Sequence, residues 1–287
     1  MHSEVTIISV CYDSTSVLGL MLSSIPEGTP TIVVNNTQND AQEMKNLAGQ
    51  FGATVIQNDI NRGFGFGCNQ GAALADTQFL LFLNPDATLE PDTLDMLIQA
   101  AGKYEQASAF NPKILDSNGK PRFRRRSAIS AKDRNTASGA PDWDCEVSVL
   151  SGAAMMVRRS DFEKVHGFDE KLFLYHEDEE LSYRLRETCG PLMFIHTATV
   201  SHQGGNSSPN SLQVTELKAW HMARSGVYLA YKRGLRFPRL RRLVLATFQL
   251  VSPVCWFSVR KRKKQLAIFK GVLSSFSDFG AGYKDPS

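Results

Sequence analysis

The sequence predicts an α/β fold with a mostly parallel central sheet flanked by helices. In the first third of the chain, short and almost wholly apolar runs alternate with segments of helical periodicity. One such run, FLLFL, follows a glycine-rich segment at residues 61–71 and ends at Asn84-Pro85-Asp86. Because ligands of open α/β sheets bind outside the carboxyl ends of strands, this order indicates a site for a phosphate-bearing ligand with a divalent metal.

Four strands and four helices are expected in alternation. The strands are expected at residues 5–11, 30–35, 53–57 and 79–83. The helices are expected at residues 16–24, 41–51, 66–75 and 91–104. This order is typical of a sheet that carries helices on both faces.

The regular alternation stops after residue 111. A polar segment at residues 116–144 predicts a long loop, of a kind that is often functional. Its basic run at residues 120–126 suits either an acceptor diphosphate or a solvated loop. The further elements expected are a buried strand at residues 147–157, helices at 161–166 and 181–189, the second starting near Glu177, and a strand at 192–200.

The composition is that of an ordinary globular protein, with 42% hydrophobic and 21% charged residues among 287. The five cysteines form no Cys-x-x-Cys pair, which argues against a zinc ribbon or a disulfide framework and fits a reducing compartment. The chain runs directly into a strand-like segment, so we expect no signal peptide and a cytoplasmic protein.

Charge divides the chain into an acidic and a basic part. The first 216 residues hold 27 acidic and 17 basic residues, whereas residues 217–277 hold fourteen basic residues and no acidic one. Within residues 236–264, basic runs flank seventeen uncharged residues, which is short for a membrane span. This pattern suits a segment at an anionic membrane surface, and the alternative is a helix pair packed on the domain. Nucleic acid is a poorer match, because few aromatic residues are interleaved with the basic ones.

The glycine-rich segment NRGFGFGCNQG does not fit the dinucleotide fingerprint G-x-G-x-x-G. A looser pattern fits Gly65, Gly67 and Gly71, and glycines in this pattern can also serve tight packing of a helix on a strand. The segment follows the third expected strand rather than the first, which argues against a nicotinamide-dependent oxidoreductase.

Three further positions carry candidate chemistry. Asp86 suits Mg²⁺ or Mn²⁺ held together with a diphosphate, or else a turn after the strand. The four acids at residues 177–180 suit either a general base or a favourable helix start. His202, before glycines and a serine, suits a metal or phosphate contact, although a lone histidine is more often structural.

Taken together, these motifs resemble the bacterial family-two glycosyltransferases of the GT-A fold, particularly the rhamnosyltransferase-like branch. The resemblance covers about residues 5–232. It rests on five motifs in order, namely the run from Asn61 to Gly71, LNPD at 83–86, Ser151-Gly152-Ala153 with Arg158-Arg159, GFDEKLFLYHEDEELSYR at 167–184, and His202 with Gly205 and Ser207.

The resemblance implies an inverting transferase that uses a nucleotide diphosphate sugar. It implies that Asp86 and His202 bind the metal and that Asp178, or less favourably Glu177, is the general base. The implied nucleotide-sugar pocket consists of Val10, Tyr12, Asn35, Asn36, Asn61, Arg62, Gly63, Phe64, Asn69, Asn84, Gly152 and Arg224.

Two departures from the family pattern affect the donor side. Asn35 stands where the family commonly has an aspartate that meets the base, although an amide can both accept from and donate to a pyrimidine. The usual DxD motif is reduced to Asn84-x-Asp86, which predicts modest metal affinity. These departures keep open a catalytically silent sugar-nucleotide or glycan-binding protein on the same fold.

The sequence therefore predicts a GT-A domain at residues 1–232 and a basic amphipathic helical segment at residues 233–287. The expected donor is dTDP- or UDP-linked, with rhamnose favoured. The expected acceptor is a hydroxyl of a lipid-linked glycan or surface polysaccharide. The basic segment would hold the protein at the cytoplasmic face of the inner membrane, and no nucleic-acid partner is expected.

Overall fold

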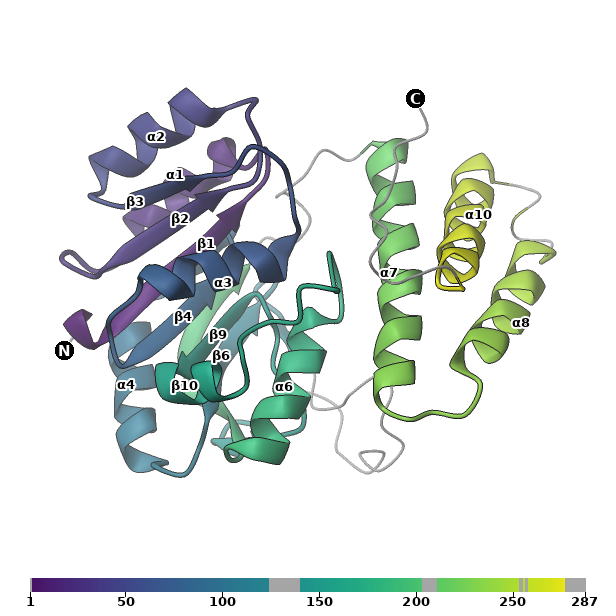
Figure 1. The fold of residues 1–287 in the computed structure, drawn as a ribbon. Helices are drawn as coiled ribbons and strands as arrows, with labels where there is room; N and C mark the ends of the chain where they lie inside the picture. Colours follow the sequence, from purple (N-terminus) through teal and green to yellow (C-terminus); the bar gives the residue numbers. More distant parts are fainter. Residues whose placement is uncertain (1, 124–139, 203–210, 253–254, 256–257, 277–287) are drawn as a thin grey trace. The chain divides into compact units, whose positions relative to one another are not determined.

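The computed structural model describes residues 2–123, 140–202, 211–252, 255 and 258–276 (Figure 1). The chain forms two compact units. The first, here called the α/β unit, comprises residues 1–169 and 178–208. The second, the helical unit, comprises residues 170–177 and 209–287. The second half of the basic run at 120–126, and the motif residues Gly205 and Ser207, lie outside the described residues.

The α/β unit is built on one sheet whose strands follow the order β3-β2-β1-β4-β9-β6-β10-β5. The first four strands are parallel to their neighbours, as expected of buried apolar runs. Beyond β4 the sheet is mixed, because β9 runs antiparallel to both β4 and β6. The strands are β1 (Val5–Cys11), β2 (Thr31–Asn35), β3 (Thr54–Gln57), β4 (Phe79–Leu83), β5 (Ala87–Leu89), β6 (Ala109–Leu115), β7 (Pro121–Arg122), β8 (Cys145–Val147), β9 (Ala154–Arg158) and β10 (Leu192–His202).

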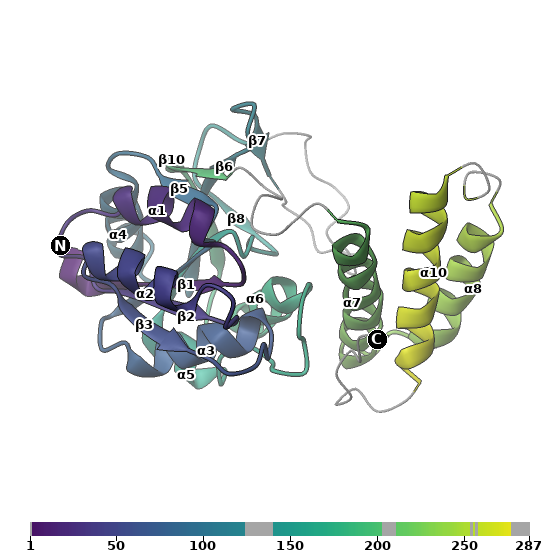
Figure 2. The same cartoon turned by 90° about the horizontal axis from the view of Figure 1, so that it is seen from above.

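Helices cover both faces of this sheet (Figures 1 and 2). Alternate side chains of β1 and β4 point to opposite faces and enter two separate cores. Helices α1, α2 and α4 pack into one core, and α3, α5 and α6 pack into the other. These helices are α1 (Thr15–Ser23), α2 (Ala41–Gln50), α3 (Phe64–Leu74), α4 (Thr93–Lys103), α5 (Arg159–Lys164) and α6 (Glu177–Thr188), and a short 3₁₀ turn, η1 (His2–Glu4), precedes β1. The predicted α/β architecture is confirmed.

The prediction of one continuous strand at residues 147–157 is wrong. The structure has two strands there, β8 and β9, separated by residues 148–153, which end in a turn at residues 151–153. β8 pairs with β10, whereas β9 lies between β4 and β6. Apolar residues on both sides of Ser151-Gly152 gave the pattern of one strand, because both strands are buried.

The three glycines of the loose pattern lie inside α3 and serve packing. A Cβ atom on Gly65 would come within 2.9 Å of Phe168 Cβ, and one on Gly67 within 2.9 Å of Val10 Cγ1. On Gly71 it would lie 2.5 Å from Ile8 Cγ2. Since real side chains do not approach so closely, the absence of Cβ atoms is what lets α3 lie directly on the sheet.

The helical unit contains α7 (Leu212–Lys232), α8 (Pro238–Leu250) and α10 (Val259–Ser274). Its core includes Ala223, Val227, Ala246 and Val272. Gly271 allows a close contact between α10 and α7, because a Cβ atom there would lie 2.4 Å from the carbonyl oxygen of Trp220. The contacts thus group α7 with the helices that follow it, whereas the sequence analysis ended the first domain at residue 232. Among the described residues, no helix has the length and apolarity needed to cross a bilayer.

Candidate active site

Asp86 and His202 are brought together by strand register. β5 pairs antiparallel with the end of β10, so that Ala87 lies opposite His202. His202 Nε2 consequently lies 3.1 Å from Asp86 Oδ1, although 116 residues separate the two in sequence. The Asp86 side chain is 1% exposed and that of His202 14% exposed. The two predicted metal ligands therefore form a nearly buried pair at the carboxyl end of β4.

This pair offers one carboxylate and one imidazole. Asn84 completes the group, with its Nδ2 atom 3.5 Å from His202 Nε2. Within the described part of the chain, no cluster of three or more His, Cys, Asp or Glu side chains is arranged to hold a metal ion. Two protein ligands fit a divalent cation that takes its remaining ligands from water and substrate phosphates, which is how Mg²⁺ is usually bound. They do not fit a structural zinc site, which needs four.

The turn at residues 151–153 connects this pair to the start of α6. The backbone N–H of Asn84 donates to the carbonyl of Ala153 at 3.0 Å. On the other side of the turn, the N–H of Gly152 donates to Asp178 Oδ2 at 3.3 Å. The residue that contacts Asp178, Gly152, is therefore the direct neighbour in sequence of the residue that contacts Asn84, Ala153.

The side chain of Asn111 on β6 forms hydrogen bonds with the backbone of the same turn and of the residue after it. Asn111 Oδ1 accepts from Ser151 N at 2.6 Å, and its amide nitrogen donates to the carbonyls of Ser151, at 3.1 Å, and Ala154. Asn111 is 7% exposed. A buried amide with both of its ends bonded to one turn restricts how that turn can move.

Asp178 lies in the first turn of α6 and is half-buried. Its Oδ1 accepts from the backbone N–H of Glu179 at 2.8 Å, in addition to the Gly152 contact of Oδ2. A helix N-terminus is a favourable position for a carboxylate. Asp178 is thus an oriented carboxylate that keeps some access to solvent, as a general base requires.

The other three acids of this cluster are buried. Glu177 is 8% exposed and belongs to the helical unit. The pKa of Tyr175 in the same unit is raised, first by the burial of Tyr175 itself and then by the charge of Glu177. Glu179 is fully buried, and Glu180 pairs with Arg184, with 2.5 Å between Oε2 and Nη2. Among the four, Asp178 has the carboxylate that best suits a reaction with an external hydroxyl.

The amides after β2 form an internal network. Asn35 is fully buried; its Nδ2 donates to Asp40 Oδ1 and Gln57 Oε1, both at 3.1 Å, and its Oδ1 accepts from Thr37 N at 3.3 Å. Both amide N–H groups and one acceptor position of Asn35 are therefore used by Asp40, Gln57 and Thr37. These contacts tie the end of β2 to β3 and to the start of α2.

Asn36 joins that loop to the start of α3. Its Nδ2 donates to the carbonyl of Gly63 at 3.2 Å, and its Oδ1 accepts from Asn58 at 2.7 Å. Asn58 in turn forms a reciprocal amide pair with Gln70 on α3. Gln57, Asn58 and Gln70 were not among the predicted site residues. The sequence feature that could have indicated them is the presence of three amide side chains next to or within the glycine-rich segment.

Other predicted pocket residues lie around the N-terminus of α3. Gly63 precedes the helix with a φ of 100°, and Asn61 Oδ1 accepts from its N–H at 2.9 Å. The guanidinium of Arg62 lies 3.6 Å over the ring of Phe66. Phe64 meets Phe168 edge to face. Asn61, Arg62 and the half-exposed Tyr12 after β1 are exposed, whereas Gly63 is buried and Phe64 partly buried.

Three predicted pocket residues have internal contacts. Val10 packs under α3 at Gly67. Both ends of the Asn69 amide bond to the backbone of Phe168, at 2.8 and 3.0 Å, which holds the loop that follows α5. Arg224 belongs to the helical unit, where it donates to the carbonyl of Ser274 at 3.1 Å. A cation at the C-terminus of α10 stabilises that helix.

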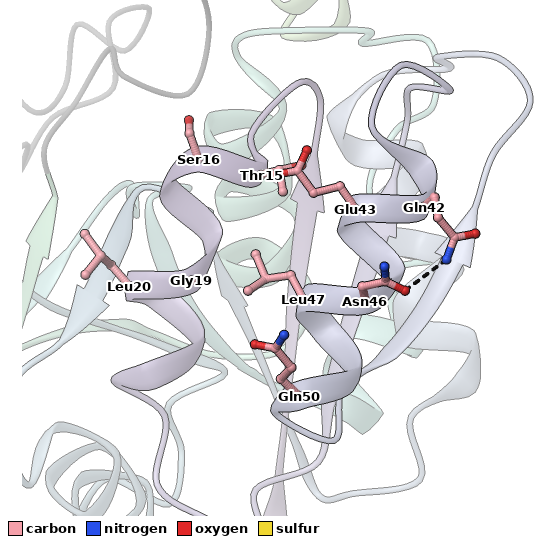
Figure 3. Close-up of a pocket in the computed structure, with 9 residues that line it drawn as sticks. All are labelled: Thr15, Ser16, Gly19, Leu20, Gln42, Glu43, Asn46, Leu47 and Gln50. Carbon is pink, nitrogen blue, oxygen red and sulfur yellow. Dashed lines mark hydrogen bonds between the residues drawn. The ribbon is translucent and has the colours of Figure 1, made fainter.

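A pocket of about 760 Å³ lies elsewhere, between α1 and α2 (Figure 3). Leu47 points between the two helices, and Gln42 bonds to Asn46 across one turn at its edge. None of the predicted site residues lines it. Its volume alone therefore does not identify the reacting centre.

The fold and these residues define a class. The chain belongs to glycosyl transferase family 2, whose family model matches residues 6–166. It is accordingly a glycosyltransferase, and this confirms the family resemblance seen in the sequence motifs.

Within that class, relatives are similar over most of the chain. The N-acetylglucosaminyl-diphospho-decaprenol L-rhamnosyltransferase of Mycobacterium tuberculosis is 24% identical over 312 residues, covering 94% of this chain and 99% of the relative. Rhamnosyltransferase WbbL of Escherichia coli K12 is 26% identical over 206 residues, covering 60% of this chain and 72% of WbbL.

Solved structures show the same GT-A type of fold. The mannosyltransferase PcManGT of Pyrobaculum calidifontis, solved with GDP-Man and Mn²⁺, superposes with a TM-score of 0.60 at 12% identity, covering 96% of this chain and 87% of its own. Staphylococcus aureus TarS 1–349 with UDP-GlcNAc superposes with a TM-score of 0.55 at 15% identity, covering 95% and 81%.

Proposed function

We propose that this glycosyltransferase is metal-dependent and inverting, and that it moves a sugar, with rhamnose favoured, from a dTDP- or UDP-linked donor to an acceptor hydroxyl. The observation that carries the proposal is the turn at residues 151–153. It bonds to Asn84 beside the Asp86–His202 pair on one side and to Asp178 on the other. One short segment of backbone therefore contacts both the strand end that carries the candidate metal ligands and the candidate base.

Asp86 and His202 would hold Mg²⁺ or Mn²⁺, as their chemistry and separation allow. When bound, the cation supplies Lewis-acid stabilisation of the charge that develops on the leaving diphosphate. The burial of Asp86 strengthens its electrostatic interaction with a cation, because screening by water is weak there. Asn84 lies beside them, with its Nδ2 atom 3.5 Å from His202 Nε2.

Asp178 would take the proton of the acceptor hydroxyl. The hydroxyl oxygen forms a bond to the anomeric carbon while the bond from that carbon to the diphosphate oxygen breaks. The proton passes to the carboxylate, and the nucleoside diphosphate leaves with the electron pair. Because the oxygen attacks opposite the leaving group, configuration at the anomeric carbon is inverted. The two N–H groups that orient the Asp178 carboxylate prepare it for this step.

The choice of rhamnose and of a lipid-linked or surface-glycan acceptor is supported by the names of the relatives. One carries N-acetylglucosaminyl-diphospho-decaprenol in its name, and two are rhamnosyltransferases. An acceptor of that kind resides in a membrane. We therefore include peripheral association with the cytoplasmic face of the inner membrane, through the basic C-terminal segment, in the proposal.

A donor screen tests the proposal. We expect dTDP- or UDP-sugars to raise the unfolding temperature in the presence of Mn²⁺, and GDP-sugars to have a smaller effect, since a ligand at about a hundred times its Kd stabilises the native state by about 2.7 kcal/mol. The best donor is then incubated with a polyprenyl-diphosphate-linked N-acetylglucosamine, and the anomeric configuration of the product is read by NMR.

Retention of configuration, or turnover that is unchanged by removal of all divalent metal, would contradict the mechanism. Donor binding without either transfer or hydrolysis would favour a catalytically silent binding protein.

A further inference from the structure

The helical unit leaves an apolar stripe exposed on α8. Within this unit α10 lies between α7 and α8 in both views, and α8 makes far closer contact with α10 than with α7 (Figures 1 and 2). The side of α8 that faces its neighbours carries Ala246, which is buried, and Leu243. The exposed stripe consists of Phe237, Leu240, Val244, Phe248 and Val251, all at least 45% exposed.

Leu240, Val244 and Phe248 follow one another at intervals of four residues, which places them on one face of α8, whereas Phe237 and Val251 cap its two ends. Two of them are about 70% exposed phenylalanines. An amphipathic helix normally buries its apolar face, and α8 already has an inner face that does so. The outward stripe stays largely exposed among the described residues, and exposed apolar patches of this kind mark interaction surfaces.

Basic residues lie at both ends of the stripe. Arg236 and Arg241 are exposed at the start of α8. At the N-terminus of α10, Arg260 begins a run of five exposed basic residues that ends at Lys264. Cations in the first turn of a helix oppose its dipole, so this arrangement favours an external anion. One of these cations, Lys263, has its Nζ 3.6 Å from Glu216 Oε1.

We propose that this face of α8, here called the α8 face, docks on an anionic lipid bilayer, with the five stripe residues inserted at the interface and the flanking basic residues on lipid phosphates. The proposal rests on the proposed function, because it gives the membrane association assumed there a defined surface. Exposed phenylalanine, leucine and valine between cations suit lipid better than nucleic acid, whose binding uses aromatic platforms along a basic groove.

Vesicle flotation of the full chain tests the α8 face. We expect the protein to float with vesicles of phosphatidylcholine and phosphatidylglycerol in equal parts, and to stay at the bottom with phosphatidylcholine alone. The double variant Leu240→Asp/Phe248→Asp should bind the mixed vesicles at least about a hundredfold more weakly, because each residue contributes roughly tenfold to partitioning. The variant Lys261→Gln/Arg262→Gln/Lys264→Gln should lose most of its salt dependence.

A matched control is Leu20→Asp/Leu74→Asp, which changes two leucines of similar exposure on α1 and α3. It should float like the unchanged protein. Thermal unfolding of each variant checks that it is folded. Flotation of the Leu240→Asp/Phe248→Asp variant at the unchanged level would overturn the proposal, as would a protein that ignores vesicles and binds single-stranded DNA.

Binding of dTDP-rhamnose with Mn²⁺, followed by thermal shift, separates this proposal from the proposed function. We expect the double variant to bind this donor as the unchanged protein does. If the protein floats through the α8 face but binds no nucleotide sugar, the proposed function fails and the docking surface stands.

Discussion

The two units of this chain treat apolar and charged side chains in opposite ways. In the α/β unit, every residue of β4 is buried. Buried polar side chains of nearby strands, such as Asn35 and Asn111, are hydrogen-bonded to other groups of the same unit. In the helical unit, α8 exposes an apolar stripe between clusters of basic residues. A catalytic site needs side chains held in fixed positions, whereas a docking surface needs side chains that are accessible. The comparison therefore supports the proposal that the first unit catalyses transfer and that the second attaches to a membrane.

The largest effect is expected for a variant of the α/β unit that loses catalysis and keeps both kinds of binding. Asp178→Asn keeps the size of the side chain but removes its ability to take a proton. We expect the transfer rate to fall by about a hundred- to ten-thousandfold, with donor binding and vesicle binding unchanged. Steady-state kinetics and thermal shift measure the two quantities. Glu187→Gln, at the exposed end of the same helix, is the control, and an equal loss of donor affinity in Asp178→Asn would show a structural or ligand-binding role instead.

A smaller effect is expected at the other carboxylate. Asp86→Asn keeps an oxygen near His202 and removes the charge that a divalent cation requires. We expect transfer to fall by about a hundredfold, equivalent to about 3 kcal/mol, and donor binding to lose its dependence on Mn²⁺. Titration of the donor with and without Mn²⁺ measures this. Asp76→Asn removes an exposed charge and should change neither value; an unaltered Mn²⁺ response in Asp86→Asn would remove Asp86 from the metal site.

Stability sharpens the comparison further. Gly71→Ala places a Cβ atom 2.5 Å from Ile8 Cγ2 under α3, and we expect a loss of about 3 kcal/mol in the free energy of unfolding. Gly49→Ala, in α2, meets no atom within 4 Å and should stabilise by roughly 0.5–1 kcal/mol through helix propensity. Urea unfolding gives both values. Equal effects at the two positions would show that α3 does not depend on close packing.

The smallest effect concerns the helical unit. His221 on α7 is 3% exposed and stacks on Phe173 at 4.5 Å; burial, aided by the charge of Arg224, lowers its pKa from 6.5 to about 4. Below pH 6.5 the unfolded chain takes up a proton that the folded chain refuses. Its contribution to stability is therefore complete above pH 6.5 and is lost as the pH falls toward 4.

Between about pH 8 and about pH 5, His221 should lower the free energy of unfolding by about 2 kcal/mol. His221→Phe should flatten that part of the curve of unfolding free energy against pH, as measured by urea unfolding at several pH values. His196→Phe, a half-exposed histidine of the α/β unit, is the comparison variant. An unchanged slope in His221→Phe would show that another group controls acid stability.

β1, β2 and β4 could be predicted from the sequence because strands buried on both faces are continuous apolar runs. β3 is only partly buried, and all four strands were placed within one residue of their observed bounds. The same rule failed at residues 147–157, where β8 and β9 are both buried and only a short turn separates them. Local patterns report burial, but they do not report which strands become neighbours.

Some residues of the candidate site could also be predicted from the sequence, whereas their contacts could not. Asp86 could be proposed from its place after β4, and Asp178 from the resemblance. The contact between Asp86 and His202 depends on the register of β5 against β10, which no local pattern contains. Asn111 was missed because an asparagine in an apolar strand gives no sign of the turn that it holds.

The pairing of β10 also has a consequence for the order in which the enzyme becomes competent during synthesis. Among the described residues β10 is the last strand of the sheet in chain order, and it carries His202 at its end. A nascent chain that has reached residue 166 already contains the segment that matches the family model, yet it has neither Asp178 nor His202. Under the proposed mechanism such an unfinished chain would not consume donor sugar, because it would lack both the candidate base and one of the two candidate metal ligands.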